Sequence, residues 1–139
     1  MRKNGFTLIE VLISILLVGV AIAALVAANG SFTKANSAAA DLSTAEFLIE
    51  QVRERSISSR YDNLYSLNGT FSPPINANGV SLNGFAAFSE QITVENVSPS
   101  NFEQTVASDS GFIRVTVKVF LNSKEISSAK WLRVDIDDE

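Results

Sequence analysis

Residues 6–28 read FTLIEVLISILLVGVAIAALVAA, and they decide how the rest of the chain is organised. The stretch is about as long as a helix that crosses a bilayer, and it contains no Lys or Arg. Its one charged residue is Glu10. A carboxylate inside a membrane helix is energetically costly, so such residues usually have a partner or a task. The sequence therefore predicts one transmembrane segment over residues 6–28, with Glu10 as its functional residue.

The composition excludes several classes of function. The 139 residues suit one domain plus its membrane segment. The formal net charge is −4, and the basic residues are not clustered, which argues against nucleic acid as a direct partner. The chain has no Cys and no His, so thiol nucleophiles, imidazole bases, disulfides and the usual zinc or haem ligands are all missing. With no phosphate loop or nucleophile motif either, we expect no enzyme and no cofactor.

The leader before the apolar stretch, residues 1–5, carries Arg2 and Lys3. Basic residues favour the cytoplasmic side, so the chain beyond the membrane faces outward. An ordinary signal peptide is one interpretation, because Ala21-Ile22-Ala23 offers a small-x-small cleavage site. The length of the apolar stretch and the position of Glu10 argue against it. An uncleaved signal anchor is a second interpretation.

A third interpretation comes from Gly5 to Val11, which read GFTLIEV directly after the basic leader. This segment resembles the N-terminal motif of type IV prepilins and type II secretion pseudopilins. The resemblance covers only the leader and the first helix. It implies that a membrane-embedded prepilin peptidase cuts between Gly5 and Phe6 and that the new amino group of Phe6 is methylated.

The resemblance also implies a role for Glu10 in filament assembly, by pairing with the Phe6 amine of a neighbouring subunit. Cleavage removes the charges of Arg2 and Lys3, which changes the formal net charge from −4 to −6. A buried carboxylate without a partner is unfavourable, so the pairing would set the register between subunits more than it would add stability. The alternative is that Glu10 only reaches the membrane interface.

A long helix is predicted over residues 6–59. Beyond the membrane segment, apolar residues recur at helical spacing and form one stripe. The stripe consists of Phe32, Ala35, Ala39, Leu42, Ala45, Ile49 and Val52. The resemblance implies that the helix unwinds between Gly19 and Gly30 in a filament; Gly19 could equally serve close helix contact.

The segment 60–139 is predicted to form a globular domain outside the cytoplasm. Residues 60–87 form a loop rich in turn signals, and residues 88–139 form a small antiparallel sheet. Strands are expected at 91–97, 112–121 and 126–136, with a hairpin loop at 122–125. The amphipathic helix would cover the apolar face of the sheet, which makes the fold class α+β and pilin-like.

The last predicted strand alternates, with Leu132, Val134 and Ile136 on its apolar side. Trp131 has the opposite parity, and core or edge packing is favoured for it over an outer contact role. The acidic residues Asp135, Asp137, Asp138 and Glu139 are interpreted as a solvated tail rather than a calcium site, because they lack a fixed loop.

Together these features predict a structural subunit of a type IV pilus or type II secretion pseudopilus. The lack of Cys favours a minor pseudopilin. The expected partners are prepilin peptidase, other pilin or pseudopilin subunits, the inner membrane and its assembly platform. The expected location is the bacterial inner membrane, and then a filament in the periplasm or at the cell surface. The alternative is a membrane-tethered monomeric binding domain with an uncleaved anchor, which recognises a ligand through residues 64–84.

Overall fold

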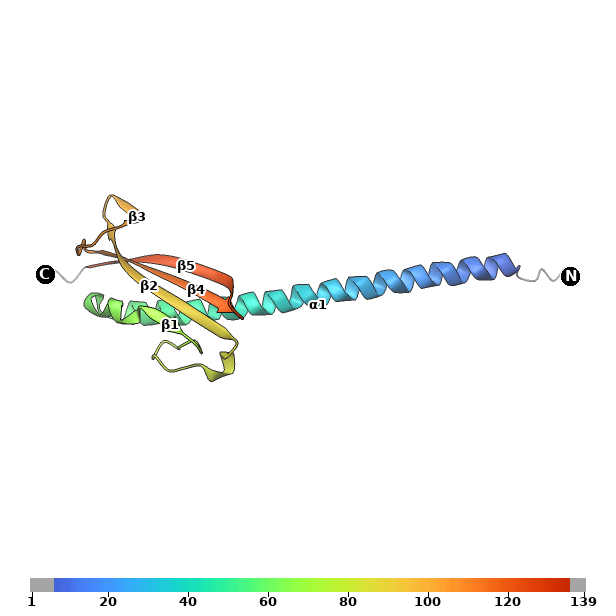
Figure 1. Cartoon of the computed structure of the whole chain (residues 1–139), viewed down its shortest axis with the longest axis horizontal. Coiled ribbons are helices and arrows are strands. Elements are labelled where there is room, and N and C mark those ends of the chain that lie inside the picture. Colours follow the sequence, from blue (N-terminus) through green and yellow to red (C-terminus); the bar gives the residue numbers. More distant parts are fainter. Residues whose placement is uncertain (1–6, 136–139) are drawn as a thin grey trace. The chain divides into compact units, whose positions relative to one another are not determined.

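The structure is a computed structural model in which residues 7–135 are described. The chain divides into two units, Met1–Ala39 and Ala40–Glu139. Figure 1 shows one long helix and an antiparallel sheet. The elements are helix α1 (Leu8–Ser58), the 3-10 helix η1 (Tyr61–Leu67), strand β1 (Gly69–Phe71), the 3-10 helix η2 (Asn83–Phe85), and strands β2 (Phe88–Ser98), β3 (Asn101–Thr105), β4 (Phe112–Leu121) and β5 (Lys124–Val134). The predicted α+β class is confirmed.

Helix α1 begins at Leu8 and continues without a break to Ser58, close to the predicted end. All described residues up to Ala40 have exposed side chains. Helix α1 is long and apolar enough near its N-terminus to cross a membrane. The first part of α1 therefore has the composition that a bilayer requires, and its described side chains are exposed.

The sheet has the strand order β1-β2-β4-β5, with every neighbouring pair antiparallel, and β3 pairs with the far end of β2. Strand β4 matches the prediction for 112–121, and β2 is longer than the predicted strand 91–97. A tight turn joins β4 to β5 through Asn122 and Ser123, which both have positive φ angles. Strands β1 and β3 were not predicted, because both are too short to show a period.

The core of the second unit lies between α1 and one face of the sheet. Leu48, Ile49 and Val52 of α1 are buried there. They face alternate residues of the two central strands, which are Ile92, Val94, Ile113, Val115, Val117 and Val119. Full burial of each such side chain contributes roughly 1.5–3 kcal/mol, so this contact is the main source of stability.

The predicted apolar stripe on α1 is wrong in its first half. Phe32 and Leu42 are exposed by 68% and 46%, and Ala35 and Ala39 are also exposed. Burial starts at Ala45 and continues through Ser56. The prediction of a helix was correct, but the spacing of apolar residues along a helix does not show how far the covering sheet extends.

The predicted parity of β5 is also wrong. Leu132 and Val134 are exposed, whereas Trp131 lies on the helix-facing side, opposite Val115. The cause is a bulge: Phe120 pairs with Glu125 but Val119 pairs with Ser127, so Ile126 is an extra residue. One extra residue moves every later side chain to the other face of a strand. Ile136 lies outside the described residues.

Strand β5 contacts the end of α1 through four interactions of Trp131 and Arg133. The indole Nε1 of Trp131 donates to Ser56 Oγ at 2.9 Å, and the guanidinium of Arg53 lies 5.3 Å from the indole ring centre. Arg133 donates to the carbonyl oxygens of Ile57 and Ser59 at 3.3 and 3.4 Å. These carbonyls have no partner within the helix, and a cation there also suits the helix dipole. Strand β5 thus caps α1.

A buried carboxylate, Glu90 of β2, holds the connection between β1 and β2. It is fully buried, and its Oε1 accepts the backbone N–H of Ile75 at 2.9 Å. Its other oxygen has no hydrogen-bond partner among the described residues. Burial raises the pKa of Glu90 to about 7, against the smaller lowering effects of the Ile75 N–H and the Arg55 charge. The half-buried Gln51 of α1 also accepts the N–H of Ala77 at 3.2 Å, so two side chains hold this connection in place.

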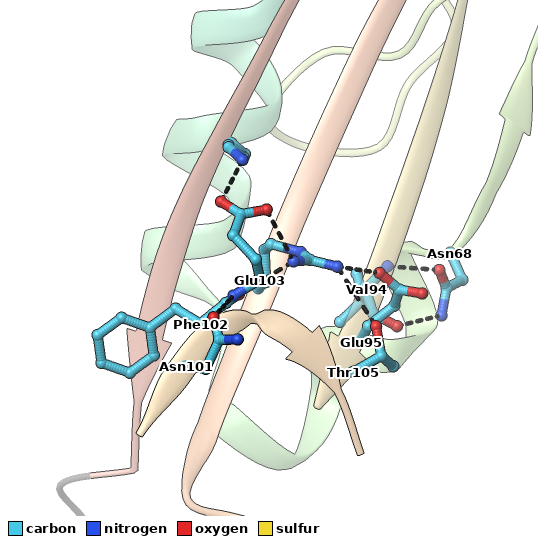
Figure 2. Close-up of polar contacts among 9 residues, drawn as sticks. Asn68, Val94, Glu95, Asn101, Phe102, Glu103 and Thr105 are labelled. Carbon is cyan, nitrogen blue, oxygen red and sulfur yellow. Dashed lines mark hydrogen bonds and ion pairs between the residues drawn. The ribbon is translucent and has the colours of Figure 1, made fainter. Parts of the chain in front are cut away.

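The short strand β3 lies over the outer face of the sheet and is held there by charged side chains (Figure 2). Arg114 of β4 donates to Glu95 at 2.8 Å and to the carbonyl oxygen of Phe102 at 3.0 Å. Glu103 of β3 pairs with Arg114 and with Lys130 of β5. The Phe102 ring also packs on Phe112, with 5.5 Å between ring centres.

The corrected parity of β5 predicts unequal losses of stability for two neighbouring substitutions. Trp131→Ala removes half-buried packing and the bond to Ser56, and should lower the free energy of unfolding by about 2–4 kcal/mol. Leu132→Ala changes an exposed side chain and should cost less than about 1 kcal/mol. Urea unfolding of the full chain in detergent, followed by circular dichroism, measures both. A larger loss for Leu132→Ala than for Trp131→Ala would contradict the parity described.

The raised pKa of Glu90 predicts a pH-dependent stability. Because the pKa is about 7 in the folded protein and ordinarily 4.5, folding favours the protonated carboxyl. The stabilisation is complete below pH 4.5 and is lost as the pH rises through about 7. Glu90→Gln should remove this decline and raise the unfolding free energy at pH 8 by up to about 3 kcal/mol.

Urea unfolding at several pH values, followed by the fluorescence of the single tryptophan, measures this effect. Glu54→Gln is the matched control, because Glu54 is an exposed acid on α1 and its substitution should leave the pH dependence unchanged. An unchanged decline in the Glu90→Gln variant would assign the pH dependence to other groups.

Candidate functional site

The candidate site lies at the start of α1, where Glu10 is in the first turn and exposed. Thr7 precedes the helix, and its carbonyl oxygen accepts the backbone N–H groups of Glu10 and Val11 at 3.1 and 3.3 Å. The Thr7 hydroxyl oxygen also faces the N–H of Glu10, at 3.4 Å. Thr7 is therefore the residue that caps the helix.

The spacing from Thr7 to Glu10 is that of a capping box, in which a Thr is followed three residues later by Glu or Gln. This role of Thr7 was not predicted, although the Thr-x-x-Glu pattern is present in the sequence. A negative charge in the first turn also suits the positive end of the helix dipole. Glu10 thus has a structural reason to lie where it does, in addition to any role between subunits.

The carboxylate of Glu10 has no ion-pair or hydrogen-bond partner among residues 7–135. After Lys3, the next basic residue in the sequence is Lys34, which is more than six helical turns beyond Glu10. The only cation that cleavage after Gly5 would create near Glu10 is the amine of Phe6. Gly5 and Phe6, the residues expected at the cleavage and methylation sites, lie outside the described residues.

The helix surface around Glu10 is almost entirely apolar. Large hydrophobic side chains from Leu8 to Val26 are exposed by 45% or more in a single chain. Ser14 is a polar residue within this apolar segment. Its hydroxyl donates to the backbone carbonyl oxygen of Glu10 at 2.8 Å, so its polar group is satisfied within the helix. A surface of this kind is suited to lipid or to the same helix of another subunit, and not to water.

The rest of the described chain has few candidate groups for metal binding or catalysis. Residues 7–135 contain no group of three His, Cys, Asp or Glu side chains that could hold a metal ion. Asp135 lies within this range, whereas Asp137, Asp138 and Glu139 of the acidic tail lie outside it. The hydroxyl of Tyr61 donates to Asp109 at 3.0 Å, and burial together with that carboxylate raises the pKa of Tyr61. This pair joins η1 to the segment before β4.

Comparison with known proteins gives one match. Residues 1–26 match the family model of the prokaryotic N-terminal methylation motif. No curated protein matches the chain significantly, and no solved structure does. The motif covers Gly5, Phe6 and Glu10 and indicates a structural subunit. The chain therefore carries the type IV pilin signature, and its long apolar helix and small antiparallel sheet make it pilin-like in both motif and fold.

Proposed function

We propose that the protein is a subunit of a helical filament, either a type IV pilus or a type II secretion pseudopilus. The observation that carries this proposal is the methylation motif at the start of a long, uncovered apolar helix. In the proposal, residues 1–5 are the leader, residues 6–28 hold the protein in the inner membrane, and the unit from Ala40 onward lies outside the cytoplasm. The filament then extends into the periplasm or to the cell surface.

The proposed partners follow from these parts. Prepilin peptidase cuts between Gly5 and Phe6 and methylates Phe6, and the inner-membrane assembly platform transfers the mature subunit to the filament. Other pilin or pseudopilin subunits pack against residues 6–39, whose side chains from Thr7 on are exposed in the single chain. The lack of Cys and the small sheet support a minor pseudopilin within this class.

In this proposal Glu10 pairs with the Phe6 amine of the neighbouring subunit. The support is that Glu10 has no partner among the described residues, while its charge lies on an otherwise apolar surface. An unpaired carboxylate among packed helices would be strongly unfavourable, so a subunit in the wrong axial position would be rejected. The ion pair would thus select the register.

The first test is the mass of the mature protein from its native host. We expect a chain that begins at Phe6 and carries one additional methyl group. Cleavage after Gly5 exposes the amine that the ion pair with Glu10 requires. Intact-mass spectrometry and N-terminal peptide sequencing measure this. A product that begins at Met1 would support a tethered monomeric domain instead, and one that begins at Ala24 would indicate an ordinary signal peptide.

The second test separates the charge of Glu10 from its capping position. Glu10→Gln keeps a residue that suits a capping box but removes the charge, and we expect it to reduce filament incorporation strongly. Thr7→Val removes the capping hydroxyl, keeps Glu10, and should reduce incorporation much less, since a lost cap costs only about 1 kcal/mol. Immunoblotting of sheared filaments against total membrane protein measures incorporation.

Circular dichroism of both variants in detergent checks that the sheet unit remains folded. Normal incorporation of the Glu10→Gln variant would remove the ion pair from the mechanism. Equal losses in both variants would assign Glu10 to the helix start alone.

A further inference from the structure

Strand β5 forms one edge of the sheet and is the longest strand edge that the described residues leave open. It is the last strand in the order β1-β2-β4-β5 and has eleven residues. None of its residues is fully buried, whereas four residues of β4 are. The opposite edge is β1, which has only three residues.

The register shows which peptide groups of β5 point away from the sheet. The N–H of Asp135 donates to the Gly111 carbonyl at 2.9 Å, and Phe112 pairs with Val134. In an antiparallel pair, bonded residues alternate, so Arg133, Trp131 and Ala129 direct their peptide groups toward β4. The peptide groups of the alternate residues therefore face outward; these residues are Ser128, Lys130, Leu132 and Val134.

These outward peptide groups have no hydrogen-bond partner within residues 7–135. Natural sheets usually protect such an edge with a bulge, a proline or an outward lysine. The bulge of β5 lies at Ile126, near the hairpin, and the strand contains no proline. The ammonium of Lys130 is bonded to Glu103 on the outer face, so it does not occupy the edge. The half of β5 from Ser128 to Val134 is thus regular and accessible.

A hollow of about 360 Å³ lies beside this half of β5 on the outer face of the sheet. It is lined by Phe102, Glu103, Arg114, Lys130, Trp131 and Leu132. Phe102 and Leu132 are 42% and 38% exposed. The cations of Arg114 and Lys130 are already paired with Glu95 and Glu103, as Figure 2 shows for the labelled acids on β2 and β3. The hollow therefore suits apolar, uncharged side chains.

We propose that the edge of β5 from Ser128 to Val134 binds an extended segment of a different polypeptide, which adds a strand to the sheet. The outward peptide groups bond to its backbone. Residues of the added strand that bond to Ser128–Val134 place their side chains on the outer face, so the apolar ones enter the hollow beside Phe102 and Leu132.

A different polypeptide is favoured over a second copy by two observations. The opposite edge of the sheet, β1, has three residues and is too short to match Ser128–Val134 in a head-to-tail pairing. Pairing of β5 with β5 of a second copy would be two-fold and would close into a dimer, whereas filament growth needs head-to-tail contacts. The second point rests on the proposed function; the open edge does not.

The test uses the uncleaved full chain in detergent micelles and a capped seven-residue peptide, Thr-Val-Thr-Val-Thr-Val-Thr. In the proposed pairing, the three valines face the hollow and donate their N–H groups to β5. We expect the peptide to slow hydrogen exchange at the amides of Ser128, Lys130, Leu132 and Val134. The same peptide with N-methylated valines should not, because it cannot donate. Nuclear magnetic resonance of the ¹⁵N-labelled protein measures exchange at each amide.

A matched pair of variants tests the edge from the protein side. Leu132→Pro removes an outward N–H that no strand uses and is tolerated at an edge, so the peptide should bind at least about tenfold more weakly. Leu132→Ala keeps the N–H and removes only a side chain that lines the hollow, so it should weaken binding less than Leu132→Pro does. The fluorescence of Trp131 reports whether each variant is folded. If Leu132→Pro fails to fold, the N-methylated peptide still decides the outcome.

Three results would overturn the proposal. The first is no slowing of exchange at these amides with millimolar peptide. The second is equal binding of the N-methylated peptide, which would show that side chains bind in the hollow without strand pairing. The third is slow exchange that increases with protein concentration in the absence of peptide, which would make a second copy the occupant. None of these results depends on cleavage at Gly5, so the proposed function is tested separately.

Discussion

The cover that α1 provides for one face of the sheet is the contact on which the second unit depends. Strands β2 and β4 carry a continuous apolar surface, and an antiparallel sheet with one such face needs a covering layer. The buried face of α1 from Ala45 to Ser56 supplies it. Other parts attach to this pair: Glu90 holds the β1–β2 connection, and Arg133 and Trp131 fasten β5 to the end of the helix.

The sequence predicted the features that depend on long, regular patterns. The helix and strand β4 were predicted with nearly correct bounds, because their periods continue over many residues. The parity of β5 was wrong, since a single extra residue at Ile126 reverses it and no pattern in the sequence marks a bulge there. The burial of Glu90 could not be predicted either, because a Glu within a strand is normally placed at the solvent face.

Unlike the parity of β5 and the burial of Glu90, the candidate site could be predicted from a short stretch of sequence. Gly5, Phe6 and Glu10 lie within six residues of one another, so their motif can be read without any knowledge of tertiary structure. The capping role of Thr7 was not predicted, because a Thr at this position of the motif is also compatible with a membrane helix that begins at Phe6. The exposed half of α1 could be assigned to the membrane from composition. Its extent could not, because Phe32 and Leu42 already follow the apolar period although the sheet cover begins only at Ala45.

The contact of Arg133 with Ile57 and Ser59 has a consequence for how the protein is made. It joins residues 76 and 74 positions apart in sequence, and the Trp131 contact with Ser56 spans a similar distance. Synthesis proceeds from the N-terminus at about 5–20 residues per second, so the apolar face of α1 leaves the ribosome several seconds before its cover exists. During that interval the nascent chain needs another apolar surface or a chaperone to shield Leu48 and Val52.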